Sequence, residues 1–152
     1  MSCRAFMTVD PLTLRGGDSV GMAAERLMAN RYIILPVVEA DGRYIGLFGV
    51  FELLGLLLPK VATLNTLVPD LGFMADDLPG LQARLGGLRD KAIGPLARRD
   101  LPVLRPDTPI IQALLLLYRN RIALPVVEEA SGRLVGVLSY WDALAAVGAA
   151  DR

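Results

Sequence analysis

Ser139 and Asp142 stand three residues apart in the sequence LSYWDAL, where an apolar run ends and a helical pattern begins. A hydroxyl just before a helix and an acid three residues later form a capping box, in which each side chain accepts a hydrogen bond from the backbone N–H of the other residue. The same groups can also bind a sugar, because one carboxylate can accept hydrogen bonds from both hydroxyls of a cis-diol. The spacing alone favours the cap, and it does not exclude ligand binding.

The sequence offers few other groups for chemistry. The chain of 152 residues contains no histidine, which removes the commonest general base, the Ser-His and Cys-His nucleophile pairs and most zinc sites. The single cysteine, Cys3, lies near an end that we expect to be flexible, and we interpret it as a bystander. The stretch RGGDS lacks the lysine and the spacing of a phosphate-binding loop. We therefore expect no enzymatic activity, no metal site and no required cofactor.

Charge and hydropathy narrow the classes of partner. Sixteen basic and sixteen acidic residues cancel, so no net field attracts the chain to nucleic acid or to anionic lipid. Hydrophobic residues make up 53% of the chain and the mean hydropathy is +0.45, so we expect some apolar surface to close in a homodimer. The most apolar stretch, residues 44–59, is interrupted by Glu52 and three glycines and is too short to span a bilayer. With no secretory signal and no second cysteine, the chain is expected to be cytoplasmic.

The chain contains two copies of one pattern. ILPVVEADGRYIGLFGVFELL in the first half matches ALPVVEEASGRLVGVLSYWDAL in the second, so that Pro36 aligns with Pro125 and Glu52 with Asp142. The offset is ninety residues and falls to eighty-nine around the prolines. Each copy predicts a short extended segment, a helix, two β-branched runs joined by a glycine-containing turn, and a second helix.

The boundaries of these elements follow from local signals. Thr108 is a natural N-cap, with Pro109 at the first helical position. Leucines at helical spacing over residues 78–88 predict a connecting helix, which two glycines weaken; Asp76–Asp77 is interpreted as its acidic start rather than as a cation site. The predicted fold is α/β (α+β), with two β-α-β-β-α repeats. We divide the chain into repeat 1 (1–58), a partly helical connecting segment (59–94) and repeat 2 (95–152).

These duplicated segments resemble the CBS domain, and the pair resembles a Bateman module. The resemblance rests on MTVDP near the start, on LPVVE followed by GR in both copies, and on S-x-x-D in the second copy. It implies two repeats related by a pseudo-twofold axis, two clefts between them, and a regulatory rather than a catalytic role. Such clefts often hold adenosine-containing ligands, namely AMP, ADP, ATP or S-adenosylmethionine.

The resemblance also implies roles for particular residues. In the family, the aspartate of the [ST]-x-x-D turn accepts the ribose hydroxyls and the Ser or Thr reaches the phosphate side, which assigns these roles to Asp142 and Ser139. In the second cleft, Gly49 lacks the hydroxyl and Glu52 lengthens the acid, so we expect weaker binding there. The full set of expected ligand-binding residues is Ser139, Asp142, Ile122, Ala123, Pro125, Thr13 and Ile34, with Gly49, Glu52 and Pro36 in the weaker cleft.

Three further expectations qualify this assignment. The positions before the prolines, which often carry basic side chains in the family, hold Ile33, Ile34, Ile122 and Ala123 here, so phosphate counter-charges would have to come from Arg31, Arg121 or Arg133. We interpret both prolines as structural at strand starts, and Trp141 as buried or at an interface. Two functions stay open: a sensor that signals to a regulated protein on a separate chain, and a dimeric scaffold with vestigial clefts.

Overall fold

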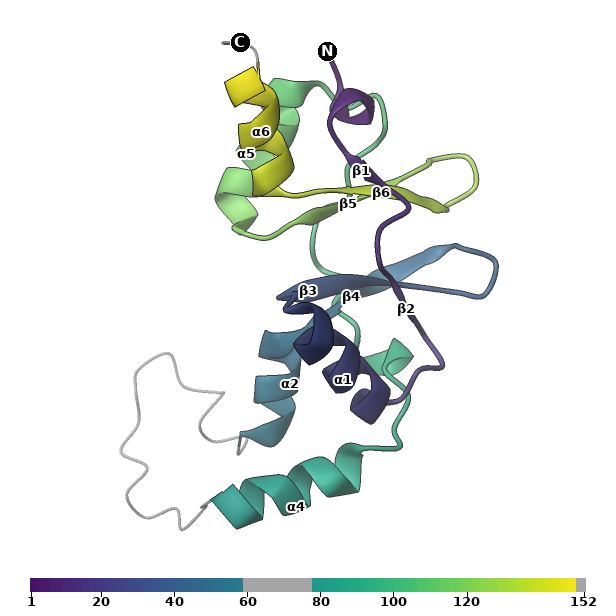
Figure 1. Cartoon of the computed structure of the whole chain (residues 1–152). Helices are drawn as coiled ribbons and strands as arrows, with labels where there is room; N and C mark the ends of the chain where they lie inside the picture. The colour runs from purple at the N-terminus through teal and green to yellow at the C-terminus, as the bar shows by residue number, and fades with distance from the viewer. Residues whose placement is uncertain (59–77, 150–152) are drawn as a thin grey trace.

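The computed structural model describes residues 1–58 and 78–149, which form two similar halves, one above the other in Figure 1. Each half contains a three-stranded sheet with helices packed beside it. This architecture confirms the predicted α/β fold with two repeats. In chain order the elements are η1 (Cys3–Ala5), β1 (Thr8–Val9), β2 (Leu14–Arg15), α1 (Val20–Asn30), β3 (Ile34–Val38), β4 (Tyr44–Gly49), α2 (Val50–Leu57), α4 (Leu78–Leu88), η2 (Gly94–Leu96), α5 (Ile110–Asn120), β5 (Leu124–Val127), β6 (Leu134–Leu138) and α6 (Tyr140–Ala149).

The two sheets differ in the origin of one strand. In the first sheet, β2 pairs in parallel with β3, and β3 pairs antiparallel with β4. In the second sheet, β5 and β6 form the equivalent hairpin, but the outer strand is β1, which pairs antiparallel with β6 through Thr8 opposite Val137. Leu104, at the place equivalent to β2, makes only an isolated parallel bridge to Val126.

The segment that leads into each repeat packs on the other repeat. Within residues 1–9, Thr8 and Val9 pair with β6, and residues 91–98 approach the first repeat, where Leu47 forms an antiparallel bridge with Arg98. The two segments make equivalent backbone hydrogen bonds. The Ile93 N–H donates to Asp18 O at 2.9 Å, and the equivalent Cys3 N–H donates to Thr108 O at 3.0 Å. Residues 1–9 and 91–98 are therefore exchanged between the two repeats, which ties the halves together.

Cys3 belongs to the second core. Its side chain is fully buried together with Leu104, Leu124 and Leu138, and burial raises the pKa of the thiol. The expectation of a flexible end at this residue was wrong, because the exchanged segment is folded against repeat 2.

The strands of both hairpins contribute side chains to the two hydrophobic cores. Leu14, Leu35 and Phe48 are almost completely buried in the first core, as Leu124 and Leu138 are in the second. Burying one such side chain stabilises the fold by about 1.5–3 kcal/mol. The strand ends that lead into α2 and α6 are therefore firmly placed.

The first helices of the two repeats begin differently. Ser19 caps α1, because its Oγ accepts a hydrogen bond from the Met22 N–H at 3.1 Å. The prediction that Thr108 caps the equivalent helix was wrong: its Oγ1 accepts from the Arg105 N–H at 2.8 Å, and Pro109 is the N-cap of α5. The hydroxyl is engaged by the preceding turn, a local bond that competes with capping.

The two hairpin turns meet at one end of the molecule, on the right in Figure 1. Gly42 and Gly132 adopt φ values of 90° and 72°, which side chains disfavour. The Tyr44 N–H donates to Gly132 O at 2.9 Å, and the Leu134 N–H donates to Gly42 O at 3.0 Å. This reciprocal pair joins the halves with the pseudo-twofold symmetry that the resemblance to the CBS domain implies.

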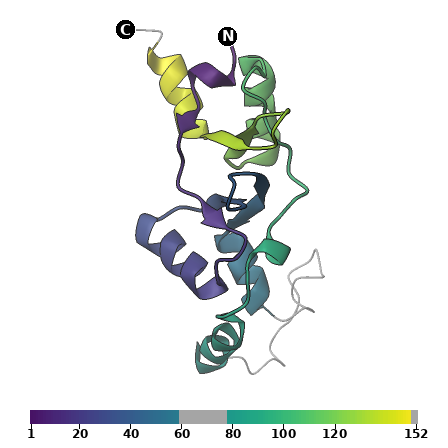
Figure 2. The same cartoon turned by 90° about the vertical axis from the view of Figure 1, so that its right-hand side faces the viewer.

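The helix expected from the leucine spacing is present as α4, at the end of repeat 1 that lies away from repeat 2 (Figures 1 and 2). Residues 59–77, which include Asp76–Asp77, lie outside the described residues. Within residues 1–58 and 78–149, no helix is both long and apolar enough to cross a membrane.

Candidate functional site

The candidate site begins where β6 ends and α6 starts. The Ser139 Oγ accepts a hydrogen bond from the Asp142 N–H at 3.0 Å, and the Asp142 Oδ2 accepts one from the Ser139 N–H at 3.1 Å. This reciprocal pair is the capping box that the spacing predicts. It also fixes the direction of the Asp142 carboxylate.

Thr8, on the exchanged strand β1, holds the same carboxylate. Its Oγ1 lies 3.2 Å from Oδ1 and 3.1 Å from Oδ2 of Asp142, so one hydroxyl donor is shared between the two oxygens. An ionised carboxylate has about four acceptor positions. The Thr8 hydroxyl and the Ser139 N–H therefore leave about two of them for other donors.

This carboxylate faces a cleft between the repeats with a volume of about 650 Å³. Such a volume lies within the usual range for small-molecule sites. Of the expected residues, Ser139, Asp142, Ile122, Ala123 and Ile34 line this cleft, and so does Pro36, which we had assigned to the weaker cleft.

The other expected residues do not line this cleft. Thr13 lines an adjacent, more open hollow, in which the Arg26 guanidinium donates to its carbonyl oxygen at 2.9 Å. Pro125 is fully buried in the second position of β5. Gly49 and Glu52 lie at the equivalent start of α2 and line neither hollow.

Three residues with unusual backbone conformations line the cleft. Asp10, Arg31 and Arg121 have φ values of 53°, 54° and 57°, and they are the non-glycine residues with positive φ in the described parts of the chain. Such conformations cost energy and tend to cluster at functional sites. Arg31 and Arg121 end α1 and α5, so the repeat symmetry brings both arginine residues to one cleft.

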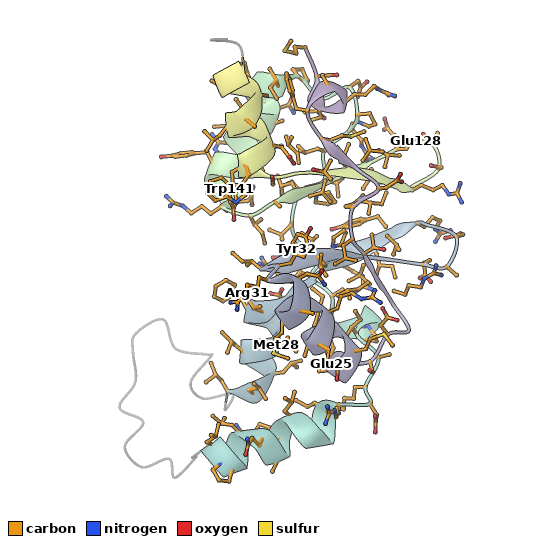
Figure 3. The ribbon with its side chains drawn as sticks, in the orientation of Figure 1. Glu25, Met28, Arg31, Tyr32, Glu128 and Trp141 are labelled. Carbon is orange, nitrogen blue, oxygen red and sulfur yellow. The ribbon has the colours of Figure 1, made fainter. Side chains whose placement is uncertain are left out.

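Aromatic residues contribute to the lining of the cleft. Tyr32, Phe51, Tyr140 and Trp141 all line it, and Trp141 is 71% exposed. Figure 3 shows Trp141 on the upper repeat and Tyr32 with Arg31 on the lower repeat, at the same side of the boundary. Trp141 was expected to be buried or at an interface, and its side chain is not buried within the single chain.

The equivalent position in repeat 1 has different chemistry. Arg98 stands at the place of Thr8, and its guanidinium donates two hydrogen bonds of 3.1 Å to the carboxylate of Asp100. These bonds lower the pKa of Asp100, and they raise the pKa of Arg98, with a smaller contribution from the charge of Glu52. The Glu52 Oε1 is buried and has no hydrogen-bond partner among the described residues.

Gly49 is required by a close approach between strands. A Cβ atom at this position would lie 2.1 Å from the carbonyl oxygen of Ile33. A serine equivalent to Ser139 therefore cannot stand here without movement of the backbone.

Sequence reasoning missed Thr8, Asp10 and the aromatic residues of this site. Thr8 is part of the quoted MTVDP motif, but its contact with Asp142 spans 134 residues of sequence, so no local pattern reveals it. Asp10 aligns with Asp100 in the second copy, but Asp100 is not among the positive-φ residues, so this alignment gives no signal of the backbone conformation of Asp10.

Comparison with known proteins agrees with this description. The family model of the CBS domain matches residues 3–59 and 93–149. Similar solved structures include CBSX2 from Arabidopsis thaliana, with 23% identity over 99% of this chain and 96% of that chain and a TM-score of 0.76, and CBSX2 in complex with AMP, with 23% identity over 99% and 98% of the two chains and a TM-score of 0.73. MJ1225 from Methanocaldococcus jannaschii, a proposed archaeal homolog of g-AMPK, matches with 21% identity over 96% of this chain and 47% of that chain and a TM-score of 0.73. No curated protein matches the chain.

Proposed function

The chain belongs to the CBS domain family, and from this premise we propose that it is a cytoplasmic regulatory module that binds an adenosine-containing ligand. The ligand is of the AMP, ADP, ATP or S-adenosylmethionine type and occupies the cleft at Ser139 and Asp142. Its binding stabilises one arrangement of the two repeats, and a partner on a separate chain responds to that arrangement. The module itself carries out no reaction.

The observation that carries this proposal is the state of the Asp142 carboxylate. It is oriented by the Ser139 N–H and the Thr8 hydroxyl, and about two of its acceptor positions stay free. Two hydroxyls of a ribose cis-diol match that number. Hydrogen bonds to an ionised acceptor are about twice as strong as neutral ones, which favours a sugar at this end of the cleft.

The other lining residues suit the rest of such a ligand. The apolar side chains of Ile33, Ile34 and Ile122 offer a surface for a flat base, and the guanidinium groups of Arg31 and Arg121 offer counter-charges for phosphate. The AMP complex of CBSX2, a protein of the same fold, supports this ligand class.

A thermal-shift experiment tests the proposal. AMP, ADP, ATP and S-adenosylmethionine are added separately to the full chain, and at least one should raise its melting temperature, because a ligand that binds only the folded state stabilises it. Asp142→Asn should keep the fold and reduce that shift, since asparagine retains an oxygen acceptor but loses the charge. The 2′-deoxy form of the active ligand should bind the wild type weakly. If no member of the panel shifts the melting temperature, the ligand-sensing function is wrong.

We also propose that the module is a homodimer. Phe51 and Leu54 on α2 are 67% and 50% exposed, and the equivalent Trp141 and Leu144 on α6 are 71% and 63% exposed. A soluble monomer rarely exposes such apolar helix faces. Sedimentation at micromolar concentration should show a dimer; a single species of 16.4 kDa would contradict it.

These exposed faces also favour the second function, a dimeric scaffold whose clefts are vestigial. The two functions differ in one result. A scaffold dimerises and shows no melting-temperature shift with the ligand panel. A sensor dimerises and also shows a melting-temperature shift.

A further inference from the structure

A second hollow adjoins the cleft on the side of repeat 1. We call it the α1 hollow, because it lies between α1 and the segment that leads into β2, which Figures 1 and 2 show beside each other. Its volume is about 570 Å³. The hollow and the cleft share four lining residues, namely Asp10, Pro11, Leu12 and Asn30. A ligand in the cleft therefore lies next to the α1 hollow.

Three residues line the α1 hollow and not the cleft, and two of them are cations: Thr13, Arg15 and Arg26. The half-buried Arg26 guanidinium is oriented by one hydrogen bond of 2.9 Å, which its Nη1 donates to Thr13 O. A guanidinium group has five N–H donors, so about four of them remain for a ligand. Neither Arg15 nor Arg26 forms an ion pair with a carboxylate within residues 1–58 and 78–149.

The equivalent place in repeat 2 lacks this polar lining. At the ninety-residue offset, Thr13 and Arg26 correspond to Val103 and Leu116. Leu116 packs against the core of repeat 2 as a partly buried side chain. The shared fold is therefore compatible with an apolar residue at this place, and it does not require the charge of Arg26.

The two equivalent arginines of the leading segments also differ. The Arg105 guanidinium donates a hydrogen bond of 3.2 Å to Val127 O within its own repeat. Arg15 is exposed, and its guanidinium has no such partner in the parts of the chain that the structure describes. Because the fold makes no use of the Arg15 guanidinium, this group is available to a ligand.

We propose that the α1 hollow binds a phosphate group through Arg15 and Arg26. Guanidinium groups present their N–H donors in a planar fork that matches the oxygen atoms of a phosphate, and the resulting hydrogen bonds are charge-assisted. Asp10 is the carboxylate that lines the hollow, and it also lines the cleft. It therefore stands at the border of the two spaces, where its single negative charge is outweighed by the two arginines.

The phosphate group has two possible sources. One source is a nucleotide in the cleft, such as ADP or ATP, whose terminal phosphates extend into the hollow across the shared lining. This source rests on the proposed function. The other source is a free phosphate compound that occupies the hollow by itself, and this source does not depend on a ligand in the cleft.

Calorimetric titrations of the full chain at constant ionic strength test the proposal. The probes are inorganic pyrophosphate and the series AMP, ADP and ATP without Mg²⁺. Arg26→Leu installs the residue of repeat 2, and Arg15→Gln removes the charge of an exposed side chain. Each variant should lower the affinity for pyrophosphate, or the advantage of ATP over AMP, by about tenfold, because a charge-assisted hydrogen bond is lost. The affinity for AMP should stay unchanged.

The two sets of probes identify the source. If the terminal phosphates of a nucleotide occupy the hollow, the wild type binds ATP more tightly than AMP, and Arg26→Leu removes that difference. If a free phosphate compound occupies it, pyrophosphate binds the wild type both with and without saturating AMP, and Arg26→Leu weakens this binding.

A matched control separates the site from the overall charge. Arg119→Gln removes the same charge from an exposed residue of α5 that lines neither space, so it should leave every affinity unchanged. Thermal melts show whether the variants are folded. Arg15→Gln changes an exposed side chain and should not alter stability by more than about 0.5 kcal/mol, so it decides the question even if Arg26→Leu does not fold.

Three outcomes would overturn the proposal. The wild type neither binds pyrophosphate nor prefers ATP to AMP; both variants bind these probes as well as the wild type does; or Arg119→Gln weakens binding as much as Arg26→Leu, which means that only net charge matters. If no nucleotide binds at all, the proposed function is wrong, and the pyrophosphate titration still decides whether the hollow is a phosphate site.

Discussion

The starts of α2 and α6 occupy equivalent places in the two repeats and present opposite chemistry to the space between them. At α6, the Asp142 carboxylate is held by Ser139 and Thr8 and keeps free acceptor positions. At α2, Gly49 supplies no hydroxyl, and Arg98 replaces Thr8.

The two repeats share one backbone arrangement and differ in the side chains at the start of their second helices. The backbone of both repeats is maintained by the same exchanged segments and hairpins. In repeat 1 an internal cation, Arg98, occupies the place from which Thr8 acts in repeat 2, and it is paired with Asp100. In repeat 1 Arg98 thus pairs with Asp100, and the Oε1 atom of Glu52 has no hydrogen-bond partner among the described residues. In repeat 2 the Asp142 carboxylate is held by hydrogen bonds and lines the cleft.

The largest effect is expected from Gly49→Ser, the substitution that would restore the missing hydroxyl. The new Cβ would lie 2.1 Å from Ile33 O, so the backbone must shift, at a cost of about 2–3 kcal/mol of unfolding free energy. Denaturant unfolding measures this loss. Gly55→Ala, at a helix position with free space around the Cβ, is the matched control and should not destabilise; a Gly49→Ser protein as stable as the wild type would refute the steric argument.

Ser139→Ala should cost about 1 kcal/mol of stability, the usual value of an N-cap hydroxyl. The reason is the bond of 3.0 Å that the Ser139 Oγ accepts from the Asp142 N–H, for which α2 has no side-chain counterpart. The same unfolding measurement applies, and Ser139→Thr should retain most of the stability. Equal stability of Ser139→Ala and the wild type would show that the cap contributes nothing.

Thr8→Val should weaken the active adenosine ligand about three- to fivefold, because one neutral hydrogen bond contributes about 1 kcal/mol. Valine preserves the shape of the side chain and removes the hydroxyl that orients Asp142. Thr8→Ser should bind as the wild type does. Arg98→Gln changes the equivalent residue of repeat 1 and should leave affinity unchanged; tighter binding by Thr8→Val would mean that Thr8 competes with the ligand.

The smallest effect concerns the pH dependence of the stability that the Arg98–Asp100 pair gives to repeat 1. Because its bonds lower the pKa of Asp100 in the folded state, the unfolded state takes up the proton more readily. The resulting stabilisation is fully present above about pH 4 and is lost as the pH falls through the lower folded pKa. Melting temperatures should therefore fall slightly less steeply below about pH 4 in Arg98→Gln than in the wild type. A steeper fall in the variant would contradict this sign.

Local sequence patterns were sufficient for the repeats and the capping box. The spacing of Ser139 and Asp142 defines reciprocal bonds within one turn, so the pair could be predicted without knowledge of the fold. The helix over residues 78–88 and the two hairpins follow from equally local signals.

Contacts between distant segments could not be predicted in this way. Thr8 meets Asp142 only because β1 crosses to β6, and the burial of Cys3 follows from the same crossing. Thr13 and Pro125 were expected in the cleft, but their exact place depends on how the two repeats stack. The exposure of Trp141 is likewise a property of the assembled surface rather than of the LSYWDAL sequence.

The most direct test of the central claim is a calorimetric titration that counts adenosine-ligand sites in the wild type, Asp142→Asn and Glu52→Gln. The account predicts one site per chain in the wild type, a loss of about ten- to a hundredfold in affinity with Asp142→Asn, from charge-assisted bonds worth about 1.5–3 kcal/mol, and unchanged binding with Glu52→Gln. Two equivalent sites per chain, or equal affinity of the wild type and Asp142→Asn, would contradict it.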